Sequence, residues 1–130
     1  MLDNGHAYIT DAAGRVKEVT GDLNLTAMDR NLYQQCTTGK CGNVGDEGGH
    51  LIASSLGGAG DKINIVPQAA TLNRGDWKAM ESQLRDALNA GKDVSVKIEV
   101  GYPSSSGVRP SEFKILAKID GKVVPFKFNQ

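Results

Sequence analysis

The sequence predicts an α+β fold, with a mainly antiparallel sheet and one principal helix over about residues 73–90. Three observations predict this fold. Apolar side chains recur at steps of three and four through residues 73–90, while residues 94–100 and 113–119 alternate between apolar and polar. Neither a repeat nor a linker divides the 130 residues, so we expect a single domain with one core.

The N-terminal residues predict a β-hairpin. Residues 7–10 and 15–19 are strand-like, and Asp-Ala-Ala-Gly at 11–14 supplies the turn between them. His6 precedes the first strand, and we expect its side chain to be exposed and structural. Further along, residues 39–60 hold eight of the 16 glycines, around the apolar run 50–53. We expect a long irregular loop there, and such loops in compact domains are often functional.

The helix over 73–90 has one apolar stripe. Four residues at helical spacing form it: Trp77, Met80, Leu84 and Leu88. Gly91 stands where a C-terminal glycine cap belongs, and Asn73 or Asp76 is expected to cap the start. The strands follow, with Asp120-Gly121 as a two-residue hairpin turn and Pro125 indicating an edge strand over 123–128.

Composition and charge restrict the class of protein. The chain has no apolar run near the roughly 20 residues of a membrane-spanning helix. Its 15 basic and 15 acidic residues balance, whereas nucleic-acid binders usually have a basic excess. The distribution is uneven, because residues 1–50 carry four basic and seven acidic side chains and residues 92–130 carry seven and four. The N-terminus has no signal-peptide pattern and begins abruptly, so we expect a domain excised from a larger protein.

The two cysteines are not expected to be catalytic. Cys36 and Cys41 are too far apart for a Cys-x-x-Cys redox motif, and no second pair completes a zinc site. A small disulfide-closed loop and two reduced thiols both fit this spacing.

Several residues have the chemistry of a metal-assisted hydrolytic site. His50 follows two glycines, and the ordinary pKa of histidine suits a general base. Asn64, Gln68, Asn73 and Glu81 offer the hard oxygens that Mg²⁺ prefers. Each also has a structural explanation: His50 as an inert loop histidine, Asn73 as a helix cap, and Glu81 as the partner of Arg85 at i+4.

Three separated blocks together resemble the DNA/RNA non-specific endonuclease family, the ββα-metal nucleases. The blocks are Asp-x-Gly-Gly-His-Leu-Ile-Ala at 46–53, Asn-Ile-Val-Pro-Gln at 64–68 and Leu-Asn-Arg-Gly-x-Trp-x-x-x-Glu at 72–81. Tyr-x-Thr-Asp-x-x-Gly-Arg at 8–15 and Arg-Pro-Ser at 109–111 are similar to the bacterial toxin-type branch. The resemblance implies a ββα-metal core within the α+β fold.

The resemblance also implies a role for each matching residue. His50 corresponds to the general base, and Asn73 to the asparagine that binds hydrated Mg²⁺, for which Mn²⁺ is an alternative. Glu81 corresponds to the acid that orients metal-bound water, and Asn64 to an asparagine that orients the catalytic group or the substrate. Arg85 falls where the family often has a phosphate-contacting arginine. Further expected substrate-binding residues are Arg74, Arg109 and Gln68.

One block departs from the family pattern. The usual Asp-Arg-Gly-His reads Glu47-Gly48-Gly49-His50 here, so Gly48 replaces the arginine and Glu47 or Asp46 takes the place of the aspartate. We expect residues 46–49 to support His50 as a loop. The missing positive charge has three candidates, Arg30, Arg74 and Arg109.

The function implied is a metal-dependent endonuclease that acts on DNA, with RNA as a second substrate. The family context further implies the C-terminal toxin domain of a larger bacterial protein, secreted or delivered into the cytoplasm of a target cell and neutralised by an immunity protein. A nuclease with two histidine ligands is disfavoured, because His6 and His50 are too few for base and ligands together. The alternative from a different class is a non-catalytic module that binds nucleic acid or protein on the same fold.

Overall fold

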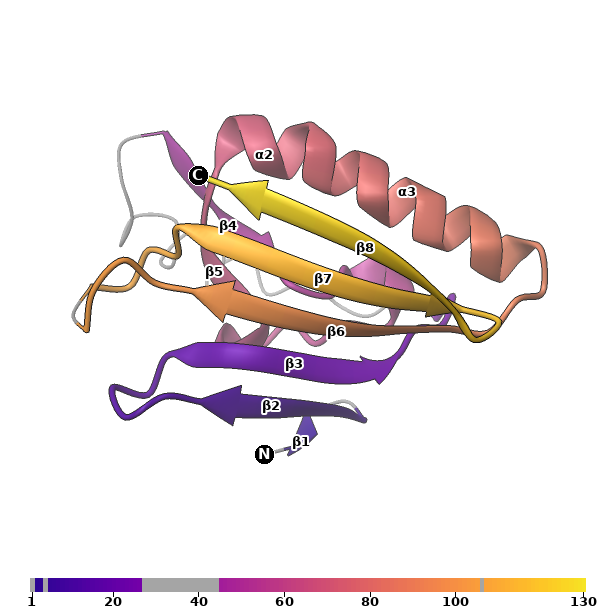
Figure 1. Cartoon of the computed structure of the whole chain (residues 1–130), viewed down its shortest axis with the longest axis horizontal. Coiled ribbons are helices and arrows are strands. Elements are labelled where there is room, and N and C mark those ends of the chain that lie inside the picture. The colour runs from indigo at the N-terminus through magenta and orange to yellow at the C-terminus, as the bar shows by residue number, and fades with distance from the viewer. Residues whose placement is uncertain (1, 4, 27–44, 106) are drawn as a thin grey trace.

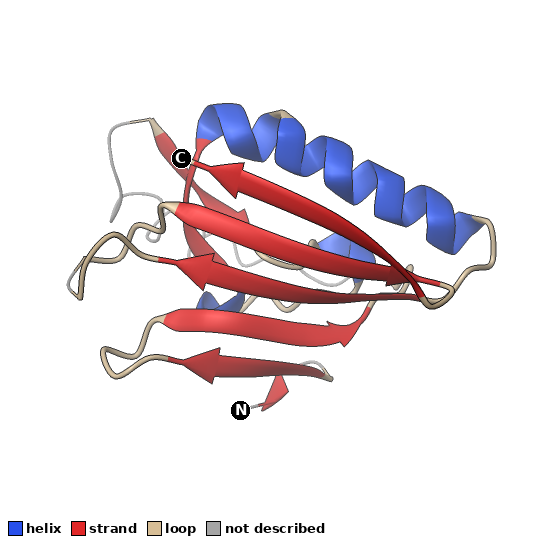
Figure 2. Ribbon diagram, viewed as in Figure 1, coloured by secondary structure: helices blue, strands red, loops and turns tan. Residues whose placement is uncertain are grey.

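A computed structural model describes residues 2–3, 5–26, 45–105 and 107–130. Two antiparallel sheets and a helical segment form the fold (Figures 1 and 2). The larger sheet has six strands in the order β1-β2-β3-β6-β7-β8: Leu2–Asp3, His6–Thr10, Val16–Asp22, Val94–Gly101, Glu112–Ile119 and Lys122–Asn129. The smaller sheet pairs β4 (Asp46–His50) with β5 (Ile65–Ala69), and the helices are α2 (Ala70–Arg74) and α3 (Asp76–Asn89).

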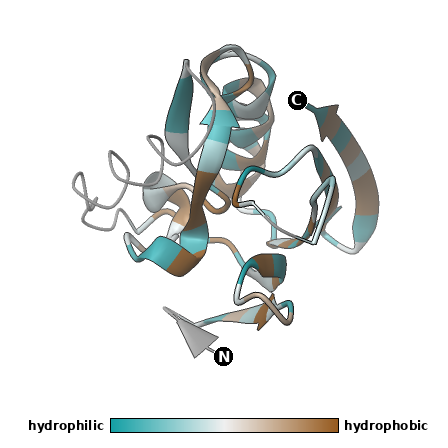
Figure 3. Ribbon diagram, turned by 90° about the vertical axis from the view of Figure 1, so that its left-hand side faces the viewer, coloured by the Kyte–Doolittle hydropathy of each residue, from teal (hydrophilic) through white to brown (hydrophobic). Residues whose placement is uncertain are grey.

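The large sheet confirms the alternating patterns in the C-terminal third of the chain. Every second residue of β6 is buried, as are Phe113, Ile115 and Ala117 of β7, and these side chains pack against α3 and the segment after β4. The turn at Asp120 and Gly121 has positive φ at both residues, 49° and 82°, as a two-residue hairpin requires. β8 is an edge strand with Pro125 exposed on it, and Figure 3 shows its alternation as bands of two colours.

The core lies on one face of the large sheet. Trp77 of α3 is fully buried there, and its ring meets Phe113 edge-on at 5.1 Å and Phe128 at 5.6 Å between centroids. Leu51, Ile52 and Leu56 belong to the same cluster. The chain just after β4 is therefore anchored in the core, which fixes the end of β4 relative to α3.

Trp77→Ala is expected to destabilise the fold by about 3–5 kcal/mol, because it removes a large buried side chain and leaves a cavity. That loss is a large share of the roughly 5–15 kcal/mol of a typical domain. Urea unfolding monitored by circular dichroism measures it. Leu116→Ala is the control, since Leu116 is 47% exposed on the opposite face. Equal effects of the two substitutions would contradict this assignment of the core.

The helical segment begins earlier than the sequence predicts and is divided in two. Gly75 separates α2 from α3, and neither Asn73 nor Asp76 is an N-cap, because no side-chain cap bond forms at either helix. The expected cap is therefore wrong: Asn73 lies inside α2 and its amide bonds elsewhere. The C-terminal cap at Gly91 is confirmed, with bonds from Gly91 N to Leu88 O and from Lys92 N to Ala87 O.

His6 corrects another expectation. Its side chain is 2% exposed, not solvent-exposed, and Nε2 lies 3.0 Å from the Asp22 carbonyl oxygen. It packs over Gly21, where a Cβ would come within 2.2 Å of the imidazole ring. The histidine is thus part of the sheet β2–β3 and lies outside the candidate site.

The C-terminal residue joins the two sheets. Gln130 accepts a bond from Ala69 N at 2.7 Å, and its Nε2 donates to the carbonyls of Pro67 and Pro110 at 3.1 and 2.7 Å. These bonds hold β5 against the segment before β7. No helix in the described residues is long and apolar enough to cross a membrane.

Candidate active site

The β4–β5 hairpin carries His50 to the edge of a pocket. Asp46 to His50 pair antiparallel with Ala69 to Ile65, and His50 is the last residue of β4 with 8% of its surface exposed. The sequence Asp-Glu-Gly-Gly-His gives little sign of a strand, and we expected an irregular loop there. The strand forms because β5 is apolar and buried, and supplies a partner for every residue of β4.

Gly49 permits a close approach between the two strands. A Cβ on Gly49 would lie 2.3 Å from Oε1 and 2.8 Å from Cβ of Gln68. Gln68 therefore fills the space beside the glycine and is fully buried. This corrects the expectation that Gln68 binds substrate: a side chain with no exposed surface supports the hairpin and does not meet a polynucleotide.

Asn64 stabilises the backbone that follows His50. Its Oδ1 accepts from Ile52 N at 3.0 Å, and its Nδ2 donates to the carbonyls of Ile52 and Ala59 at 2.8 Å each. The residue is fully buried, so its amide does not reach a substrate. These bonds instead hold the segment 51–59 in place, and this segment in turn fixes the position of His50.

Glu47 connects β4 to α2. Its Oε1 accepts from Nδ2 of Asn73 at 3.1 Å, and its carboxylate pairs with the guanidinium of Arg74. The bond from Arg74, followed by that from Asn73, lowers the pKa of Glu47 below its usual 4.5. Because the folded-state pKa is the lower one, this contact contributes stability above pH 4.5 and loses it as the pH falls through the lowered pKa.

Asp46 makes a second ion pair at the start of β4. Arg109 Nε donates to its Oδ2 at 2.7 Å, and Nη2 to Oδ1 at 3.3 Å. The Asp46 side chain is 3% exposed, so the pair is largely shielded from water. Arg74 and Arg109, both expected to bind substrate, are thus bound to the carboxylates of β4. Arg30, Cys36 and Cys41 lie outside the described residues.

A pocket of about 440 Å³ brings four of the expected residues together. His50, Asn73, Glu81 and Arg85 line it, from β4, α2 and α3. Ala53 and three further polar residues also line it: Ser54, Ser55 and Lys78. Arg85 Nη2 donates to Ser55 Oγ at 2.6 Å, which fixes the guanidinium at the pocket wall. The sequence blocks gave no reason to select the serines, whereas the helical spacing of Lys78 and Glu81 at i, i+3 could have indicated Lys78.

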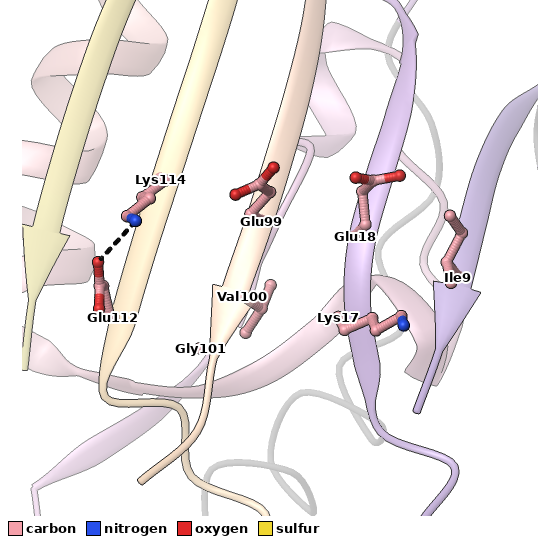
Figure 4. A pocket seen from close by; sticks show the side chains of 8 residues that line it. All are labelled: Ile9, Lys17, Glu18, Glu99, Val100, Gly101, Glu112 and Lys114. Atoms are coloured by element: carbon pink, nitrogen blue, oxygen red, sulfur yellow. Dashed lines mark ion pairs between the residues drawn. The ribbon is translucent and has the colours of Figure 1, made fainter. Parts of the chain in front are cut away.

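Another pocket, of about 450 Å³, lies on the exposed face of the large sheet (Figure 4). Glu18, Glu99 and Glu112 line it together with Lys17 and Lys114, and Lys114 pairs with Glu112 at 3.7 Å. It has no histidine and no amide side chain. The combination of a base and a neutral oxygen donor belongs to the His50 pocket.

The donor set of the His50 pocket fits a hard divalent cation. The one side-chain hydrogen bond that Asn73 makes with described residues uses Nδ2, so Glu47 fixes the amide and leaves Oδ1 available to bind a cation. A single amide ligand with water in the remaining positions suits Mg²⁺. Throughout the described ranges, no three His, Cys, Asp or Glu side chains gather as a closed metal site would require.

The chain is similar in sequence to two larger bacterial proteins. The sequence is 42% identical over 126 residues to the type VII secretion system protein EssD of Staphylococcus aureus (strain USA300). This match covers 91% of this chain and 20% of EssD. It is 38% identical over 72 residues to the probable deoxyribonuclease RhsA of Dickeya dadantii (strain 3937), covering 55% of this chain and 5% of RhsA. The chain therefore spans about a fifth, or less, of these relatives.

Solved structures share the fold. NucA from Streptococcus agalactiae with magnesium bound has a TM-score of 0.71 at 16% identity, over 94% of this chain and 69% of that one. The Sda1 nuclease with bound zinc has a TM-score of 0.74 at 16% identity, over 96% and 74%. At this identity the likeness concerns the fold, and it confirms the mainly antiparallel sheet with a ββα-metal core that the sequence predicts.

The family follows from the extent of the sequence match. The family model for the DNA/RNA non-specific endonuclease covers residues 1–121, which include β4, β5, both helices and every residue of the His50 pocket. The chain belongs to the DNA/RNA non-specific endonuclease family, whose members are hydrolytic nucleases.

Proposed function

We propose that the pocket hydrolyses phosphodiester bonds of DNA, with RNA as a second substrate, using His50 as general base and one hydrated Mg²⁺ on Asn73. The observation that carries the proposal is the shared pocket. His50, Asn73 and Glu81 come from three elements and line one cavity of about 440 Å³. A base, a metal ligand and a carboxylate within one cavity are the groups that metal-assisted hydrolysis needs.

The chain's own groups divide the reaction between them. His50 takes the proton of the attacking water. Asn64 holds its position through bonds to the backbone that follows it, and Gln68 packs against the preceding Gly49. Asn73 presents Oδ1, which Glu47 orients through Nδ2. Glu81 accepts hydrogen bonds from the waters beside Asn73, and Arg85, held by Ser55, contacts the phosphate. The cation, when bound, supplies positive charge for the oxygen of the leaving group.

We further propose that the domain is the toxic nuclease of a larger bacterial protein. The relatives named a type VII secretion system protein and a probable deoxyribonuclease are several times longer than this chain. On this proposal the protein is secreted or delivered as part of that larger chain and acts in the cytoplasm of a target cell. A cognate immunity protein then protects the producer by covering or flanking the His50 pocket.

Removal of divalent metal is expected to abolish cleavage. Supercoiled plasmid DNA and a structured RNA are incubated with the purified chain in Mg²⁺, in excess EDTA, and in EDTA followed by excess Mg²⁺ or Mn²⁺. Cleavage in the first and third conditions alone supports the proposal, and the RNA arm establishes the substrate range. Binding of either nucleic acid with cleavage in none of the conditions would replace the nuclease by a non-catalytic binding module.

A further inference from the structure

Within the described residues, the candidate arginines do not supply the positive charge that is missing beside His50, and the third candidate, Arg30, lies outside those residues. Gly48 occupies the position of the family arginine before His50. Arg74 is paired with Glu47, and Arg109 with Asp46. A polynucleotide entering the pocket brings several negative charges, and among the described residues Arg85 is the one arginine that lines it. A further cation at the wall would balance the phosphates that flank the reacting one.

Lys78 has the position that this requirement calls for. It lines the pocket with His50, Asn73 and Glu81, and its side chain is exposed. In the part of the chain that the structure describes, no carboxylate forms an ion pair with it, in contrast to Arg74 and Arg109. A lysine ammonium is a compact charge on a flexible side chain, so it can reach a phosphate whose position differs from one substrate to another.

The helix arranges the charges in a row. Lys78, Glu81 and Arg85 are spaced i, i+3 and i+7, which puts them on one face of α3. With a rise of 1.5 Å per residue, Lys78 lies about 4.5 Å before Glu81 along the axis and Arg85 about 6 Å after it. The two cations therefore lie on either side of the Glu81 carboxylate along the helix axis.

We propose that Lys78 binds the phosphate next to the scissile one, on the side opposite Arg85. The assignment rests on the proposed nuclease function of this pocket. Because the neighbouring phosphate does not react, its contact is the same in the ground state and in the transition state. Loss of the contact should weaken substrate binding and leave the chemical step unchanged.

The consequence is a split between KM and kcat. Lys78→Gln is expected to raise KM for DNA about tenfold, the cost of one charged hydrogen bond, with kcat unchanged. The slope of log affinity against log salt should fall by about 0.7–0.9, the value of one lost phosphate contact. Lys78→Arg keeps the charge and should retain most of the affinity.

The experiment compares wild type, Lys78→Gln, Lys78→Arg and Lys122→Gln. Lys122→Gln is the control, because it removes one positive charge at an exposed position away from the pocket. Lys122 follows the Asp120–Gly121 turn at the start of β8, and this turn is bonded to Asp93 beyond the end of α3. Cleavage kinetics in Mg²⁺ give KM and kcat. Fluorescence anisotropy of a short labelled DNA in EDTA, from low to high salt, gives the binding slope without turnover.

The two measurements separate this assignment from the proposed function. A salt slope that is reduced in Lys78→Gln, unchanged in Lys122→Gln and restored in Lys78→Arg supports the phosphate contact. This conclusion holds even if the wild type cleaves no nucleic acid, a result that would refute the proposed nuclease function. Equal slopes for Lys78→Gln and Lys122→Gln overturn the assignment. A fall in kcat with KM unchanged also overturns it, since it would place Lys78 at the reacting phosphate.

Discussion

His50→Ala is expected to lower kcat about 10²- to 10⁴-fold, because the variant has no group to take the proton of the attacking water. The substitution lies at the end of β4, beside a segment that Asn64 holds in place, so the fold should survive. Steady-state cleavage of plasmid DNA in saturating Mg²⁺ measures the loss, and thermal unfolding checks that the protein is folded.

The pH profile and chemical rescue test the role more closely. The wild-type rate should rise with pH through the titration of one group, and His50→Ala should lack this limb. Added imidazole should restore part of the rate, since it can occupy the space that the ring leaves in the pocket. A variant that keeps the wild-type rate and profile would show that His50 is an inert loop histidine.

Asn73→Ala is expected to raise the Mg²⁺ concentration for half-maximal cleavage at least about tenfold, because it removes the only side-chain ligand that the proposal gives the metal. Titration of cleavage rate against Mg²⁺ measures this change. Asn73 lies inside α2 and makes no cap, so alanine at this position should cost the helix little.

Glu47→Gln is the matched comparison for Asn73. Glutamine keeps an oxygen that can accept from Asn73 Nδ2 but loses the ion pair with Arg74. Its half-maximal Mg²⁺ concentration should rise by less than that of Asn73→Ala. If Asn73→Ala lowered the unfolding temperature without changing the metal requirement, Asn73 would be a structural residue and the cation would lie elsewhere.

Much of the sheet and of the site could be predicted from the sequence because both have strong local patterns. Strict alternation identifies β6 and β7, and Asp120-Gly121 identifies the turn into β8. The motif blocks selected His50, Asn73 and Glu81, the family resemblance added Arg85, and one pocket contains all four. Their catalytic roles remain predictions, since position in a pocket does not by itself establish chemistry.

Other features could not be predicted because they depend on contacts distant in sequence. The residues of β4 have low strand propensity and pair only because β5 is buried beside them. Gln68 has a polar side chain of the kind that binds substrates, and only its packing against Gly49 across the hairpin shows that it is buried. The partners of Arg74 and Arg109 lie 27 and 63 residues away, so charge alone suggested substrate binding for both.

The proposed mechanism requires one divalent cation on Asn73, beside the base His50 in the same pocket. Anomalous scattering from a crystal of the protein soaked in Mn²⁺ would locate this cation. We expect one strong peak about 2.0–2.4 Å from Asn73 Oδ1, with waters as the remaining ligands and no bond to His50. A peak on the His50 ring, or at a site that does not include Asn73, would show that the cation is not held as proposed.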